Sequence, residues 1–227
     1  MEFPERFRTL PEYAFPRLRR LLDGHAAGGE PVAMSIGEPQ HAFPEWVGEE
    51  LASAVSEFNR YPPNNGTEGL LTAISEWIEG RFSVSVDPDT QVLSLNGTRE
   101  GLFNAAIAVC AEEKNGAKPV ILIPNPFYQV YAVAAAASGA EPRFVNATAA
   151  TGYLPDYAAL PPDVLDRVAI AYICSPSNPQ GAVATRDYWR ELLALAEKHD
   201  FRVFADECYS EIYRGDAPTG AFQIAAE

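Results

Sequence analysis

The sequence predicts an α/β protein whose mostly parallel sheet lies between helices in a three-layer α/β/α arrangement. Short apolar runs rich in β-branched residues recur along the chain, and such runs are typical of strands buried on both faces. Segments with helical periodicity lie between them, and alternation of strands and helices favours a parallel sheet. The predicted strands are Val92–Leu95, Val120–Ile123, Val168–Ile173 and Arg202–Ala205.

Apolar residues at helical spacing predict five helices. In chain order, their apolar faces include Leu18, Ile74, Ala106, Ala134 and Leu193. Thr67 and Thr185 are candidate N-caps of the second and fifth helices, and the alanine-rich fourth helix is expected to end at Gly139.

The first part of the chain differs from the rest. Prolines and a Gly-Gly pair flank its single amphipathic helix, which cannot bury a core alone. We therefore expect residues 1–34 to form an N-terminal arm or small-domain segment, and residues 35–227 to form part of a larger domain.

The composition excludes several classes of function. A net charge of −14 argues against nucleic acids and anionic membrane surfaces, because both are bound through clustered Lys and Arg. No apolar run approaches the ~20 residues that span a bilayer, and the charged N-terminus is unlike a signal peptide. We expect a cytoplasmic protein.

The cysteines and histidines point to neither a disulfide framework nor a metal site. Cys110, Cys174 and Cys208 are odd in number and far apart, which fits a reducing compartment. Cys110 and Cys174 are interpreted as small buried hydrophobes. The three histidines lack metal-ligand spacing.

Polar motifs rich in glycine or proline follow the predicted strands. In open α/β sheets, ligands bind beyond the carboxyl ends of the strands. Ordinary βα turns explain the glycines and prolines, but not the Asn, Tyr and Asp residues beside them. The motifs are Asn96-Gly-Thr-Arg-Glu100, Pro124-Asn-Pro-Phe-Tyr128, Cys174-Ser-Pro-Ser-Asn-Pro-Gln-Gly181 and Asp206-Glu-Cys-Tyr209.

Two of these motifs suggest particular chemistry. Gly97-Thr98-Arg99 opens a helix, where backbone N–H groups suit a phosphate, although Gly-Thr is also a common helix entry. Asp206 follows a buried strand, where an unpaired carboxylate is costly. Its partner is either a protonated ligand nitrogen or a helix or loop that it caps. Tyr209 either donates to a ligand oxygen or packs in the core.

Taken together and in order, the motifs from about Ser35 to Tyr213 resemble fold-type I (class I/II) aminotransferases, which depend on pyridoxal 5'-phosphate (PLP). The resemblance implies the family's large-domain fold and a cofactor site. In it, Gly97, Thr98 and Arg99 bind the phosphate, Tyr128 stacks on the pyridine ring, and Asp206 keeps the ring nitrogen protonated. Asn178 and Tyr209 bind the ring hydroxyl oxygen, and the Asn178–Pro179 bond is expected to be cis.

The resemblance also implies contacts outside this cluster. Gly37 matches the glycine whose backbone contacts the substrate carboxylate. Tyr61 matches the tyrosine that reaches the cofactor phosphate of the neighbouring subunit, which implies a homodimer.

The implied reaction moves an amino group between an amino acid, expected to be glutamate, and a keto acid. The motifs look most similar to succinyldiaminopimelate aminotransferases of bacterial lysine biosynthesis, which implies N-succinyl-2-amino-6-ketopimelate as the keto acid. A carbon–sulfur lyase or decarboxylase of the same fold is one alternative, because fold does not decide which bond breaks. An aminotransferase-like effector domain and a phosphate-binding domain without PLP are the others.

The lysines depart from the family pattern. Lys114, Lys118 and Lys198 are the only lysines, and none matches the Schiff-base lysine, which in the family follows a later strand. The resemblance therefore implies a large domain truncated before that lysine and inactive alone. It also implies that two later strands belong beside Val92–Leu95, which would otherwise stand apart from the sheet with apolar edges exposed.

Overall fold

The computed structural model describes residues 4–8, 10, 12–32, 34–37 and 41–227. The chain forms two compact units. The larger comprises Met1–Pro11 and Glu68–Glu227, and the smaller comprises Glu12–Thr67. Each unit is a group of residues that contact one another, and this division does not test the predicted domains. The domains 1–34 and 35–227 stay a prediction.

The larger unit is built on a four-stranded sheet in the order β2-β1-β3-β4. All three strand pairings are parallel, which confirms the predicted fold class. The strands are β1 (Val120–Asn125), β2 (Glu141–Asn146), β3 (Val168–Cys174) and β4 (Arg202–Asp206). Three of them were predicted from apolar runs. The sequence analysis missed β2 because it is an edge strand with a single buried residue, Val145.

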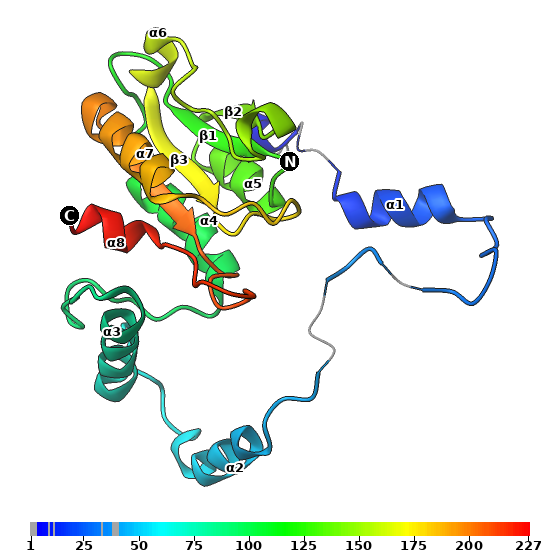
Figure 1. The fold of residues 1–227 in the computed structure, drawn as a ribbon, viewed down its shortest axis with the longest axis vertical. Coiled ribbons are helices and arrows are strands. Elements are labelled where there is room, and N and C mark those ends of the chain that lie inside the picture. The colour runs from blue at the N-terminus through cyan, green and yellow to red at the C-terminus, as the bar shows by residue number, and fades with distance from the viewer. Residues whose placement is uncertain (1–3, 9, 11, 33, 38–40) are drawn as a thin grey trace. The chain divides into compact units, whose positions relative to one another are not determined.

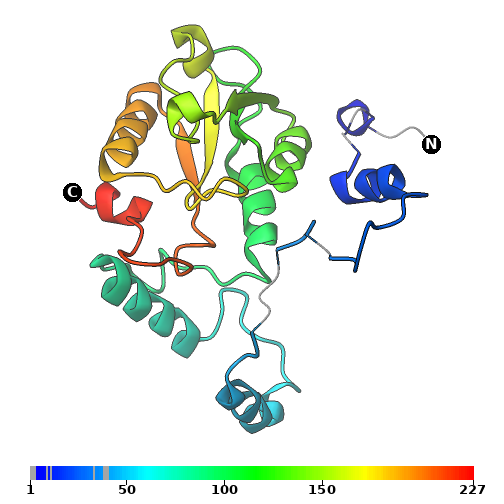
Figure 2. The same cartoon turned by 45° about the vertical axis from the view of Figure 1, so that its right-hand side comes forward.

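Helices cover both faces of the sheet (Figures 1 and 2). Val120 and Leu122 of β1 belong to the core beneath α7 and α8, whereas Ile121 and Ile123 belong to the core beneath α4 and α5. Alternate residues of one strand therefore fill two cores, as expected of a central strand. These helices are α4 (Thr98–Val109), α5 (Gln129–Ala137), α7 (Arg186–His199) and α8 (Ala221–Ala225).

The predicted helix ends are largely confirmed. The side chain of Thr185 caps α7 by accepting a hydrogen bond from the backbone N–H of Tyr188 at 3.2 Å. Helix α5 ends at Ala137, and Gly139 follows with a φ of +73°. The remaining elements are η1 (Glu5–Phe7), α1 (Ala14–Leu22), α2 (Glu45–Ser53), η2 (Val55–Glu57), α3 (Glu68–Phe82), η3 (Ala149–Thr151) and α6 (Pro162–Leu165).

The prediction of a buried strand at Val92–Leu95 was wrong for this chain. No residue of this segment lies in a strand, and the side chains of Leu93 and Leu95 are 63% and 49% exposed. A strand needs a neighbour to accept its ladder hydrogen bonds, and the sheet ends at β4. That later strands belong beside this segment stays a prediction.

Candidate functional site

A cavity of about 200 Å³ lies where β3 and β4 end and α4 begins. Five of its lining residues were predicted as site residues: Thr98, Tyr128, Asn178, Asp206 and Tyr209. Three others were not: Tyr131, Cys174 and Cys208. The cavity collects residues that lie up to 111 positions apart in the sequence, from Thr98 to Tyr209.

Asp206 is the only carboxylate that lines this cavity. It is the last residue of β4 and is only 7% exposed. Its Oδ2 accepts a hydrogen bond from the Tyr131 hydroxyl at 2.6 Å, and its Oδ1 accepts one from the backbone N–H of Cys208 at 3.4 Å. Among the described residues, no cationic side chain forms an ion pair with it. A buried carboxylate with neutral donors alone is suited to a cationic ligand.

Tyr131 is a functional residue that the sequence analysis missed. It belongs to an apolar run of α5, where an aromatic residue is usually part of the core. Burial and the Asp206 carboxylate both raise the pKa of Tyr131, so its hydroxyl remains protonated and donates. Its ring also stacks on Tyr172, with centroids 4.5 Å apart. One feature of the sequence could have identified Tyr131. It lies three residues after Tyr128, and this spacing brings two side chains of a helix to neighbouring positions.

The start of α4 borders the cavity through Thr98, its first residue. Gly97 precedes it with a φ of +106°, a conformation that favours glycine. The first-turn N–H groups of a helix carry partial positive charge, so this end is suited to an anion. Nearby, Arg99 Nε donates to the Tyr128 hydroxyl at 2.6 Å, which positions that ring.

Asn178 and Tyr209 contact one another in the lining of the cavity. Asn178 Nδ2 donates to the Tyr209 hydroxyl at 3.3 Å, and the Asn178–Pro179 bond is cis, as expected. Burial raises the pKa of Tyr209, so its hydroxyl is neutral and can donate onward. Two donors thus converge on one side of the cavity.

Gly37 and Tyr61 belong to the smaller unit, and their roles stay predictions.

No lysine lines the cavity, and all three lysines lie in the described part of the chain. The ammonium of Lys114 donates to the backbone carbonyls of Val168, at 2.6 Å, and His199, at 2.8 Å, and also to that of Asp200. Lys118 and Lys198 are exposed. Lys114 therefore ties β3 to the end of α7 and has a structural role.

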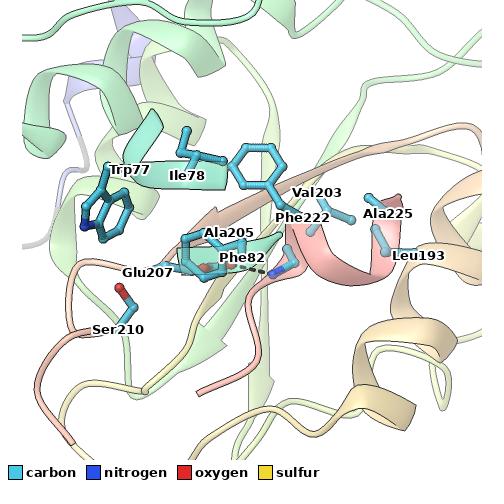
Figure 3. A pocket seen from close by; sticks show the side chains of 11 residues that line it. Trp77, Ile78, Phe82, Leu193, Val203, Ala205, Glu207, Ser210, Phe222 and Ala225 are labelled. Carbon is cyan, nitrogen blue, oxygen red and sulfur yellow. Dashed lines mark hydrogen bonds between the residues drawn. The ribbon is translucent and has the colours of Figure 1, made fainter. Parts of the chain in front are cut away.

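A second cavity, of about 390 Å³, lies beside β4 (Figure 3). Trp77, Ile78 and Phe82 of α3 face Phe222 and Ala225 of α8 across it. Its polar side chains are Glu207 and Ser210, and Glu207 Oε1 accepts a hydrogen bond from the backbone N–H of Ala221 at 2.7 Å. A third cavity, of about 470 Å³, is lined by Leu93, Leu95 and Phe204 among others. The lining of both is mainly apolar, and the third cavity shares Thr98, Asp206 and Cys208 with the first.

The parallel sheet, with a buried carboxylate and a helix N-terminus at one cavity, is the arrangement of class I and II aminotransferases. Residues 30–227 match the model of that family, and the chain belongs to it. Class I and II aminotransferases depend on PLP.

Several aminotransferases are similar to this chain along nearly all of its length. An LL-diaminopimelate aminotransferase of Dehalococcoides mccartyi is 37% identical over 215 residues, which are 93% of this chain and 54% of the relative. One from Moorella thermoacetica is 33% identical with the same coverage. An aminotransferase structure from Neisseria meningitidis matches with a TM-score of 0.91 and 36% identity, over 99% of this chain and 57% of that one. The chain thus spans about half the length of these proteins.

Within the described residues, no helix is both long and apolar enough to cross a membrane. The same residues contain no group of three or more His, Cys, Asp or Glu side chains placed to hold a metal ion.

Proposed function

We propose that the protein containing this chain is a PLP-dependent aminotransferase that moves an amino group between an amino acid and a keto acid. Asp206 carries the proposal, because its buried carboxylate faces a cavity and has only neutral donors around it. A protonated pyridine nitrogen supplies the missing positive charge.

Residues that line the cavity, and two neighbours of Thr98 at its border, are suited to the rest of the cofactor. Gly97, Thr98 and Arg99, at the start of α4, would hold the phosphate through backbone N–H groups and side-chain donors. Tyr128 would stack on the ring, and Asn178 and Tyr209 would donate to the ring hydroxyl oxygen.

PLP supplies an electron sink for the bonds at the α-carbon of the amino acid, and a protonated ring nitrogen deepens that sink. The contribution of Asp206 is electrostatic: its negative charge, poorly screened in a buried site, holds a proton on the nitrogen. Tyr131 fixes the orientation of Asp206 by donating to Oδ2.

The relatives support a proposal for the substrate class. Those named above are LL-diaminopimelate aminotransferases, and we propose a diaminopimelate-type substrate of lysine biosynthesis with glutamate as the partner amino acid. N-succinyl-2-amino-6-ketopimelate, predicted from the motifs, is the alternative keto acid. We further propose that Gly37 binds the substrate carboxylate, that the protein is a homodimer in which Tyr61 reaches the neighbouring cofactor site, and that it works in the cytoplasm.

The test compares Asp206→Ala with wild type in the purified protein that contains this chain, supplied with PLP. Loss of one electrostatic group that stabilises developing charge lowers kcat by about 10²–10³-fold, and we expect a loss of that size. Asp163→Asn, an exposed carboxylate in α6, is the control and should leave kcat unchanged. Near-normal turnover in Asp206→Ala would contradict the assignment.

The reaction class is tested with the same protein. Amino transfer that requires an added keto acid supports an aminotransferase. Without an added keto acid, formation of pyruvate and ammonia indicates a lyase, and formation of carbon dioxide indicates a decarboxylase. Comparison of kcat/KM for LL-diaminopimelate and its N-succinyl derivative then distinguishes the two proposed substrates.

A further inference from the structure

Two of the three cysteines lie together in the cofactor cavity. Cys174 is the last residue of β3 and pairs in register with Asp206, and Cys208 comes two residues after Asp206. Both line the cavity, and each thiol affects the pKa of the other. The third cysteine, Cys110, lies at the other end of α4.

The two thiols differ in access and in chemistry. Cys174 is 7% exposed, and its thiol also donates to the carbonyl of Pro176 at 3.2 Å. The interaction with Cys208 lowers the pKa of Cys174, although burial and the Asp206 carboxylate oppose this. Cys208 is exposed, and the interaction with Cys174 raises its pKa. A thiol with a lowered pKa beside an accessible second thiol is the arrangement of an attacking and a resolving cysteine.

We propose that Cys174 and Cys208 form a redox-sensitive dithiol, which a hydroperoxide oxidises to an intramolecular disulfide when the cavity holds no cofactor. The inference extends the proposed function, because it places this modification inside the PLP site.

The chemistry balances in two steps. The Cys174 thiolate attacks the O–O bond, which breaks, and a sulfenic acid forms while the other oxygen leaves as an alcohol, or as water from hydrogen peroxide. The Cys208 sulfur then attacks the sulfenic sulfur, forming the S–S bond, and hydroxide leaves and takes up a proton as water. In total, two thiols and one hydroperoxide give one disulfide, one alcohol and one water.

The disulfide would change the site that it joins. The backbone N–H of Cys208 donates to Asp206, and Tyr209 is the next residue, so a covalent link from Cys174 constrains the turn that carries both cofactor contacts. We expect the oxidised protein to bind PLP more weakly. Bound PLP fills the cavity and should in turn shield both thiols.

The test exposes the purified protein, stripped of PLP, to hydrogen peroxide and maps its peptides. The expected product is a cross-linked pair of peptides containing Cys174 and Cys208, lighter by two hydrogen atoms and separated again by dithiothreitol. Cys110→Ser should form the same product, whereas Cys174→Ser and Cys208→Ser should not. A cross-link through Cys110, or irreversible oxidation of Cys208 without a cross-link, would overturn the dithiol.

A second arm separates this inference from the cofactor assignment. With PLP at about 100 times its Kd, only about 1% of the cavities stay empty, so cross-linking should slow by about 100-fold. Equal rates with and without PLP would refute the placement of PLP in this cavity while leaving the dithiol supported. Absence of the cross-link in the PLP-free protein refutes the dithiol whatever PLP does.

Discussion

Asp206 depends on side chains and backbone groups from two different elements. Tyr131 reaches it from α5, and the backbone N–H of Cys208 reaches it from the turn after β4. Sequence reasoning placed Asp206 at a ligand site because a buried strand precedes it. It did not identify Tyr131, because no local pattern distinguishes a tyrosine that donates to a carboxylate from one that only packs.

Replacing Tyr131 with phenylalanine should affect both stability and cofactor binding. The change leaves a buried carboxylate oxygen without its donor, which costs about 1–3 kcal/mol of unfolding free energy. We also expect weaker PLP binding, because Asp206 loses the group that orients it. Denaturant unfolding and a PLP titration measure the two effects.

Tyr188→Phe is the matched control for this substitution. The Tyr188 hydroxyl donates to the backbone carbonyl of Pro155 at 2.8 Å, outside the cavity. This variant should lose stability but bind PLP as wild type does. If Tyr131→Phe also binds PLP with unchanged affinity, Tyr131 has only a structural role.

The carboxyl group of Glu207 should make the free energy of unfolding depend on pH. Burial raises the pKa of this carboxyl group, against a hydrogen bond from Ala221 and the charge of Arg81. The folded state therefore favours the protonated form. Its contribution to stability is present below the unfolded pKa of about 4.3 and is lost as pH rises through the raised folded pKa.

A glutamine at position 207 does not titrate, so Glu207→Gln should not lose free energy of unfolding as the pH rises. We expect the variant to gain stability relative to wild type between pH 4 and neutrality. The measurement is the melting temperature across that range. A constant difference between Glu207→Gln and wild type at every pH would contradict the prediction.

At the scale of elements, the packing of α3 against the start of α8 depends on a glycine. A Cβ built on Gly220 would lie 2.6 Å from Phe82 Cε1 and 2.7 Å from Glu207 Oε2. Arg81 reinforces the same contact, because it donates to the carbonyls of Ser210 and Pro218. The close approach exists only in the folded chain, so the sequence alone does not mark Gly220 as special.

Two alanine substitutions should therefore have opposite effects. Gly220→Ala overpacks this contact and should destabilise the protein by about 1–3 kcal/mol. Gly80→Ala, inside α3 with nothing within 4 Å of the added Cβ, should stabilise it by about 0.5–1 kcal/mol. Denaturant unfolding gives the free energy of unfolding of both variants. Equal changes in the two variants would show that Phe82 moves aside without loss of stability.

At the scale of the whole molecule, β4 ends the sheet with apolar cavities nearby, one lined by α3 and α8 and the other by Leu93 and Leu95. Leu93 and Leu95 are exposed although their sequence is typical of a buried strand. The segment has the composition of a sheet strand, but the described residues offer it no pairing partner.

The lysines give a prediction for the chain as a whole. We expect the 227-residue chain alone to show no transamination with PLP and glutamate, because no lysine lines the cavity and the Lys114 ammonium is bound to three carbonyls. Keto-acid formation measured beside the longer protein tests this. Turnover at the rate of that protein would show that another group replaces the lysine.

The sequence by itself determined the alternation of strands and helices and the polar residues at the strand ends. Buried apolar runs, helical periodicity and caps such as Thr185 depend on neighbours within a few positions, so they can be recognised locally. Only the tertiary structure decided that Tyr131 reaches Asp206, that Cys174 and Cys208 line one cavity, and that Val92–Leu95 stays outside the sheet. Each of these depends on which strands and helices become neighbours, and that is set by the packing of the whole core rather than by any local pattern.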